Sequence, residues 1–145
     1  MKWVTREHAR VDRIACPWLI RRFIDPTAEF LFVPADQVLA AAAREGAHSY
    51  DAPGAKYTHR GGKCSFEALI EDYHLNDAAL GLLAKIVHGA DVPADIAICP
   101  EAAGLNAIAD GFSRTTPDDH EKIRLETPLY DALYAWCTKK VGTPA

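Results

Sequence analysis

The pattern of apolar and polar positions predicts short strands in the first third of the chain and helices over most of the rest. Positions 2–6 alternate, which predicts an edge strand with Trp3 and Thr5 on one face and Val4 on the other. Positions 30–33 are mostly apolar, which is typical of a short strand covered on both sides. A third extended segment is expected at 47–52, before the turn at Pro53-Gly54.

The densest apolar segment, 10–33, combines a helix with the second strand. Trp18, Leu19, Phe23 and Ile24 have helical spacing. Pro17 is suited to the first helical position, because its missing N–H would have no partner there. We therefore expect Cys16 to be the N-cap residue of this helix, and the Asp25-Pro26 pair to end it.

Helical periodicity continues through most of the remaining chain. It predicts helices over 37–45, 65–73, 77–90, 101–112 and 128–136, with a further helix beginning at 116–121. The expected fold is α/β or α+β: a small sheet of about three short strands covered by five or six helices, with a mostly helical C-terminal half. One domain spanning 1–145 is the natural reading of this length.

Composition and charge exclude several classes of protein. Hydrophobic residues make up 49% and charged residues 25% of the chain, which are ordinary globular values. The net charge of -4 argues against specific nucleic-acid binding, which usually requires a basic surface. No apolar run approaches the ~18 residues of a membrane span, and the N-terminus does not resemble a signal peptide. The four cysteines are widely spaced and are expected to be thiols, so we expect a cytoplasmic protein.

Arg13 and Cys16 form one candidate site, for an anion. An arginine beside a helix N-terminus favours negative charge, because backbone N–H groups and guanidinium act together. The alternative is that Arg13 pairs with Asp12 or another nearby carboxylate. Cys16 also has two interpretations, a reactive thiolate activated by the helix start or a small buried apolar residue, and we favour the second.

His59 and Glu67 form a second candidate site, around the Gly61-Gly62 turn. Glu67 falls in the first turn of a helix beginning at Ser65, facing back across the glycines toward His59. A histidine and a glutamate brought together in this way suit a metal site or an acid/base pair. The alternative is a structural hydrogen bond that fastens the loop.

Two further residues are added to the candidate metal set. Asp91 follows an expected C-cap glycine and is therefore predicted to be free to face a partner. His120 lies in the first turn of a helix, where a cationic imidazole would be misplaced and the neutral, metal-binding form is favoured. His88 is assigned instead to the C-terminal end of a helix, where its charge complements the dipole. Phosphate-binding glycine motifs, the G-x-S-x-G nucleophile motif and the H-E-x-x-H zinc motif are absent from the sequence.

Several longer segments resemble the chromate-resistance family, which includes the C-terminal domains of chromate-responsive regulators. They are DRIACPWLIRRFIDP, EFLFVPADQV, HRGGKCSFEAL, IVHGAD, PDDHE and YDALYAW, and together they cover nearly the whole chain. The resemblance implies a cytoplasmic protein of a chromate-resistance system. In longer relatives this domain follows a DNA-binding region or accompanies a sulfurtransferase-like domain, and neither is expected here, so DNA binding should not be carried over.

Two functional hypotheses follow. In the first, the domain is a metal-dependent redox or oxidative-stress enzyme in which His59, Glu67, Asp91 and His120 hold Fe, Mn or Zn. In the second, it binds or senses an oxyanion such as chromate without catalysis, with Arg13 and the Cys16 helix start as the anion seat. The expected partner is in either case a small molecule or oxyanion.

Overall fold

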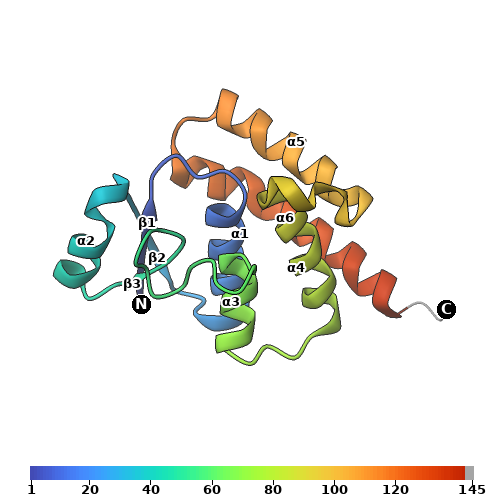
Figure 1. The fold of residues 1–145 in the computed structure, drawn as a ribbon, viewed down its shortest axis with the longest axis horizontal. Coiled ribbons are helices and arrows are strands. Elements are labelled where there is room, and N and C mark those ends of the chain that lie inside the picture. The colour runs from blue at the N-terminus through green and yellow to red at the C-terminus, as the bar shows by residue number, and fades with distance from the viewer. Residues whose placement is uncertain (143–145) are drawn as a thin grey trace.

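β1 (Lys2–Arg6) is the central strand of a three-stranded parallel sheet in the computed structural model, which describes residues 1–142 (Figure 1). It pairs with β2 (Glu29–Val33) on one side and with β3 (His48–Ser49) on the other. The register places Trp3 opposite Phe30 and His48. The expectation of an edge strand at 2–6 is therefore wrong. Its three central residues are all completely buried, which requires neighbours on both edges.

The two faces of the sheet are covered unequally. Val4 packs with Val38 and Ala41 of α2 (Val38–Glu45), which covers its side of the sheet (Figure 1). Trp3 points the other way, into the main core, as the alternation of a strand requires. On that side lie the remaining helices, so the architecture is α+β, with an extensive helical layer beside a small sheet.

α1 (Asp12–Leu19) runs through the middle of the molecule and begins earlier than expected. Its N-cap residue is Val11, so Cys16 is inside the helix and the prediction of Cys16 as N-cap is wrong. Pro17 is an interior proline, which leaves the carbonyl of Arg13 without its helical partner. The Tyr50 hydroxyl donates to that carbonyl at 3.5 Å. A long-range contact thus compensates for a local defect that would otherwise favour a later helix start.

The other elements follow in chain order, and most lie close to their predicted ranges. They are the π-helix η1 (Ile20–Ile24), the 3₁₀ turn η2 (Ala35–Gln37), α3 (Ser65–Asp72), α4 (Ala78–Asp91), the 3₁₀ segment η3 (Pro93–Ile98), α5 (Pro100–Thr115) and α6 (Asp119–Gly142). No helix within residues 1–142 is both long and apolar enough to cross a membrane.

α6 is one long helix where the sequence predicted two. Pro128 lies inside it, at a position that normally costs a helix about 3 kcal/mol. Ile123, Tyr130 and Cys137 are buried on either side of the proline, and α6 packs along both α4 and α1. Tertiary packing therefore offsets the cost of the proline, and the helix continues through it.

The start of α6 anchors the segment that follows β1. The Asp119 carboxylate accepts the backbone N–H groups of His8 at 2.9 Å and Ala9 at 2.7 Å. Lys122, which is almost fully buried, donates to the Ala9 carbonyl at 3.0 Å and lies 3.3 Å from Asp119. This contact fixes the path of the chain into α1.

We predict that Asp119→Ala lowers the free energy of unfolding by about 3–5 kcal/mol, because it removes the carboxylate bonded to the buried ammonium of Lys122 and the acceptor of the His8 and Ala9 N–H groups. The measurement is urea unfolding of the variant against the parent protein. His120→Ala is the matched control, since the His120 ring is exposed and contacts only the edge of Phe32 among the aromatic rings; it should cost about 1 kcal/mol or less. Equal losses in the two variants would contradict this role for Asp119.

Candidate functional site

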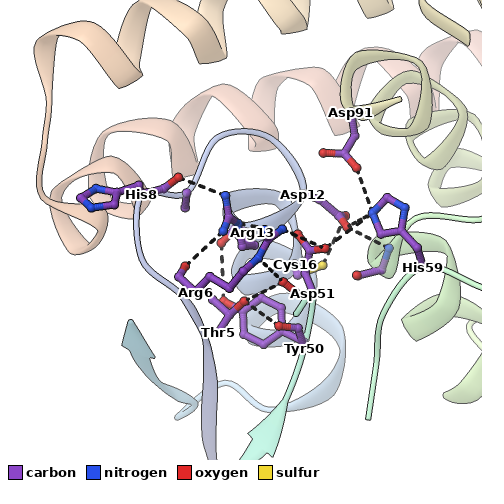
Figure 2. Close-up of polar contacts among 12 residues, drawn as sticks. Thr5, Arg6, His8, Asp12, Arg13, Cys16, Tyr50, Asp51, His59 and Asp91 are labelled. Atoms are coloured by element: carbon purple, nitrogen blue, oxygen red, sulfur yellow. Dashed lines mark hydrogen bonds and ion pairs between the residues drawn. The ribbon is translucent and has the colours of Figure 1, made fainter. Parts of the chain in front are cut away.

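Four side chains gather beyond the carboxyl ends of β1 and β3, where parallel sheets commonly bind ligands (Figure 2). They are Asp12, Asp51, His59 and Asp91, and each comes from a different segment of the chain. The His59 ring is the point at which the three carboxylates meet. We call this group the acid–imidazole cluster.

Asp12 is the most deeply buried member of the acid–imidazole cluster. It is the first residue of α1, and its carboxylate accepts the backbone N–H groups of Ser65 at 2.8 Å and Phe66 at 3.0 Å. These are the first two residues of α3, whose N-terminal N–H groups have no partner within their own helix. Asp12 thus caps a helix distant in sequence, and this holds its carboxylate in one orientation.

Asp51 follows β3 and completes the inner wall of the cluster. Its backbone has φ +44°, a left-handed conformation that is uncommon for residues other than glycine. The Asp51 carbonyl accepts the Nε–H of Arg6 at 2.9 Å, and the carboxylate lies 3.7 Å from Nε of Arg13. The two arginines therefore fix the position of an otherwise strained residue.

His59 and Asp91 form the outer part of the cluster. Nε2 of His59 lies 3.2 Å from a carboxylate oxygen of Asp91, 3.5 Å from Asp51 and 3.7 Å from Asp12. Asp91 is the last residue of α4, with its side chain 18% exposed, whereas the His59 side chain is 46% exposed. Solvent can therefore reach the cluster past His59.

The carboxylates oppose one another's ionisation. Burial, reinforced by the charges of Asp51 and Asp91, raises the pKa of Asp12 to about 8. Burial and Asp51 also raise the pKa of Asp91. Such an arrangement has excess negative charge at neutral pH, and a proton or a cation must compensate it. One ligand atom each from Asp12, His59 and Asp91 lie within 4.8 Å of one another, so small side-chain movements would allow one ion to contact all three.

The structure separates the four predicted metal ligands. His59 and Asp91 face each other, as the single-site hypothesis required. Glu67 does not join them, because its Oε1 accepts the N–H of Cys64 at 3.0 Å and lies 2.6 Å from Nδ1 of His88. His120 is the exposed second residue of α6, and its ring lies against Phe32 of β2. The predicted set of four therefore does not form one group in the described residues.

At the predicted anion site, the structure shows Arg13 bonded to the protein itself. Arg13 donates to the backbone carbonyls of Glu7 at 3.4 Å and His8 at 3.0 Å, and faces Asp51. The alternative interpretation, pairing with a nearby carboxylate, describes this arrangement. Cys16 is completely buried, and burial with the neighbouring Asp12 raises the pKa of its thiol well above the usual value. Its predicted burial is confirmed.

A second group of donors lies beside the first. Cys64, Glu67 and His88 each place one ligand atom within 4.8 Å of the others. Although burial opposes its charge, the carboxylates of Asp95 and Glu67 raise the pKa of His88. The assignment of His88 to the α4 dipole alone was incomplete, since both of its ring nitrogens contact carboxylates at 2.6 Å.

Sequence reasoning missed Asp12, Asp51, Cys64 and His88 as members of these groups. All but Asp51 lie within the segments that carry the family resemblance, so these segments held a usable signal. Asp51 lies outside them, and its position depends on a left-handed backbone conformation that the local sequence does not predict.

The fold and the acid–imidazole cluster define a small α+β domain with a carboxylate-rich site, and comparison with known proteins identifies its family. The family model "ChrB, C-terminal domain" matches residues 3–137. The chain is 37% identical over 134 residues to Protein ChrB of Cupriavidus metallidurans, covering 92% of this chain and 40% of that protein. No solved structure matches. The chain therefore belongs to the ChrB C-terminal domain family, which confirms the resemblance to chromate-resistance proteins.

We predict that the metal-free protein becomes less stable as pH rises from about 4 to about 8, because Asp12 keeps its proton in the folded state after the unfolded chain has lost it. One such group contributes a slope of up to about 1.4 kcal/mol per pH unit. Urea unfolding in the presence of a chelator measures this slope. Asp12→Asn should reduce it, and an unchanged slope in that variant would show that other groups are responsible.

Proposed function

We propose that this chromate-resistance domain is a metal-dependent enzyme in which Asp12, His59 and Asp91 bind a divalent ion, with Asp51 as a neighbouring carboxylate. The observation that carries the proposal is the convergence of three largely buried carboxylates on one imidazole. A buried excess of negative charge is costly unless a cation or a proton compensates it. A divalent ion would do so while replacing the proton of Asp12.

The donor set indicates which ions fit. Two carboxylates and one imidazole provide oxygen and nitrogen donors, which suit Mn, Fe or Zn. The ion, when bound, would act as a Lewis acid or a redox centre for a small oxygen-containing ligand. Three protein ligands leave further coordination positions, and the exposed edge of His59 gives solvent access to them. This is the arrangement of a reactive site, whereas structural sites are closed.

The reaction class depends on the ion. Chromate reduction generates reactive oxygen, and an oxidative-stress enzyme of this family would need a redox-active metal. Fe and Mn can change oxidation state, whereas Zn cannot. Identification of the bound metal therefore separates a redox enzyme from a hydrolytic or Lewis-acid one.

The alternative function, oxyanion sensing at Arg13 and the α1 start, has weaker support. Arg13 directs its N–H groups to backbone carbonyls and faces Asp51. Three carboxylates nearby would repel an oxyanion such as chromate. A metal bound between them would remove much of that repulsion, so an oxyanion is better placed as a ligand of the metal than of Arg13.

We predict that chelation lowers the melting temperature of the metal-loaded protein by roughly 5–10 °C. An ion at a hundredfold excess over its dissociation constant adds about 2.7 kcal/mol, which corresponds to several degrees for a domain of this size. Differential scanning calorimetry with and without chelator measures the shift, and elemental analysis gives the metal content.

His59→Ala should weaken binding at this site by more than the roughly 10–100-fold that loss of an outer-shell partner costs. His120→Ala is the matched control, a histidine from the originally predicted set that lies outside the cluster, and should bind as the parent does. Equal losses in both variants would place the ion elsewhere. The absence of any metal response would leave oxyanion binding as the favoured function.

We also predict that Fe- or Mn-loaded protein consumes superoxide or hydrogen peroxide faster than the metal-free protein, and that Zn-loaded protein does not. The assay compares each loaded form with its His59→Ala counterpart. Equal rates in all forms would reject the redox reaction without affecting the binding result.

A further inference from the structure

The second donor group, Cys64, Glu67 and His88, has no part in the acid–imidazole cluster. The two groups share no residue. Cys64 and Glu67 come from the start of α3 and His88 from the last turn of α4, two helices that pack against each other. Their proximity therefore depends on the helix packing and is as well defined as the core.

The start of α3 brings the first two donors, Cys64 and Glu67, close together. Cys64 is the N-cap residue of α3 and Glu67 is its third residue, and the two form a reciprocal capping box. The Glu67 carboxylate accepts the Cys64 N–H at 3.0 Å, while the Cys64 sulfur accepts the Glu67 N–H. The helix N-terminus favours negative charge on both groups. Burial and the nearby charge of Asp12 nevertheless raise the pKa of the Cys64 thiol, so a bound cation would have to displace its proton.

Asp95 orients the third donor. Nε2 of His88 lies 2.6 Å from Asp95, and Nδ1 lies 2.6 Å from Glu67. A carboxylate that accepts one ring N–H leaves the other nitrogen as a lone-pair donor, which is the usual arrangement around a metal-bound histidine. Nδ1 and the Glu67 oxygen cannot face each other at this distance without a proton or a metal ion between them.

We propose that Cys64, Glu67 and His88 form a second metal site, which takes a thiophilic divalent ion of the Zn²⁺ class. Sulfur, oxygen and nitrogen donors are the three types that zinc sites use. Two ligands of one tetrahedral zinc ion lie about 3.3–3.8 Å apart, for bonds of about 2.0–2.3 Å. The ligand atoms here lie within 4.8 Å of one another, so small side-chain movements complete the site.

The surroundings of the second site are compatible with entry of an ion. Glu67 lines an open pocket of about 410 Å³, together with Lys63, Glu71 and Gly81. The Glu67 side chain is 24% exposed and that of His88 is 11% exposed. Cys64 is completely buried, so the sulfur would be the innermost ligand.

The sulfur donor makes this site distinguishable from the acid–imidazole cluster. Titration of the metal-free protein with Co²⁺ should produce a thiolate-to-cobalt charge-transfer band in the near ultraviolet, saturating at about one equivalent per chain. Asp12, His59 and Asp91 contain no sulfur and cannot give this band. Cys64→Ser should abolish it, whereas His59→Ala should leave it intact even where that variant loses the other ion.

Cys137→Ser is the matched control, since Cys137 is equally buried but lies near the end of α6. It should retain the band. The proposal is overturned if the folded parent protein gives no thiolate band with excess Co²⁺, or if the band survives in Cys64→Ser. The spectrum of the parent protein decides the first point, so the test does not depend on the folding of any variant.

NMR of the histidine ring nitrogens gives an independent answer on the zinc-saturated parent protein. A ligand His88 has one protonated ring nitrogen, which faces Asp95. Protonation of both nitrogens at saturating Zn²⁺ would show that His88 is only an imidazolium held between two carboxylates, and would also overturn the proposal.

Discussion

The contact between the Asp12 carboxylate and the first two N–H groups of α3 holds the functional end of this domain together. It joins the start of α1 to the start of α3 across 53 positions of the sequence. It also explains why a carboxylate occurs in the core at all, because two backbone donors and a helix N-terminus partly offset the cost of burying it. Asp51 and Asp91 then approach from the sheet and from α4, and His59 lies between them.

This arrangement links stability to chemistry. The Ser65 and Phe66 N–H groups lower the pKa of Asp12. Burial and the neighbouring carboxylates have the larger effect in the opposite direction, so the pKa is raised overall. The folded protein therefore holds a proton at the place where a metal ion would be most strongly bound. Exchange of that proton for an ion is the simplest physical route by which a chromate-resistance domain with no cofactor motif in its sequence could acquire a reactive centre. The second donor group, with its cysteine, would select a different kind of ion.

Much of the fold could be predicted from local sequence, and most of the site could not. Helical spacing around Leu69 and Leu83 reflects burial directly, so these helices were predicted with nearly correct bounds. The strand at 2–6 was also predicted at the right place, but its burial on both faces was not, because that depends on the strands beside it. Pro17 misled the prediction, because a local rule places proline at a helix start and Tyr50 satisfies the freed carbonyl from 37 positions away.

Which of the predicted site residues lie together is likewise decided by contacts between segments that are distant in the sequence. Glu67 was expected to face His59 across the glycine turn, and instead pairs with His88, 21 positions along the chain. His120 was included for its local chemistry alone, and the fold places its ring against Phe32 of β2 instead of beside the other predicted ligands. His59 and Asp91 were each chosen for a local reason, a glycine turn and a helix end, and the structure places Nε2 of His59 3.2 Å from the Asp91 carboxylate.

Anomalous diffraction from crystals of the Mn²⁺-loaded protein tests the central claim most directly. The account predicts an anomalous peak between Asp12, His59 and Asp91, about 2.0–2.2 Å from Nε2 of His59 and from one oxygen of each carboxylate. Crystals at saturating Mn²⁺ that show no peak in this group, with Nε2 of His59 still in direct contact with Asp91, would contradict it.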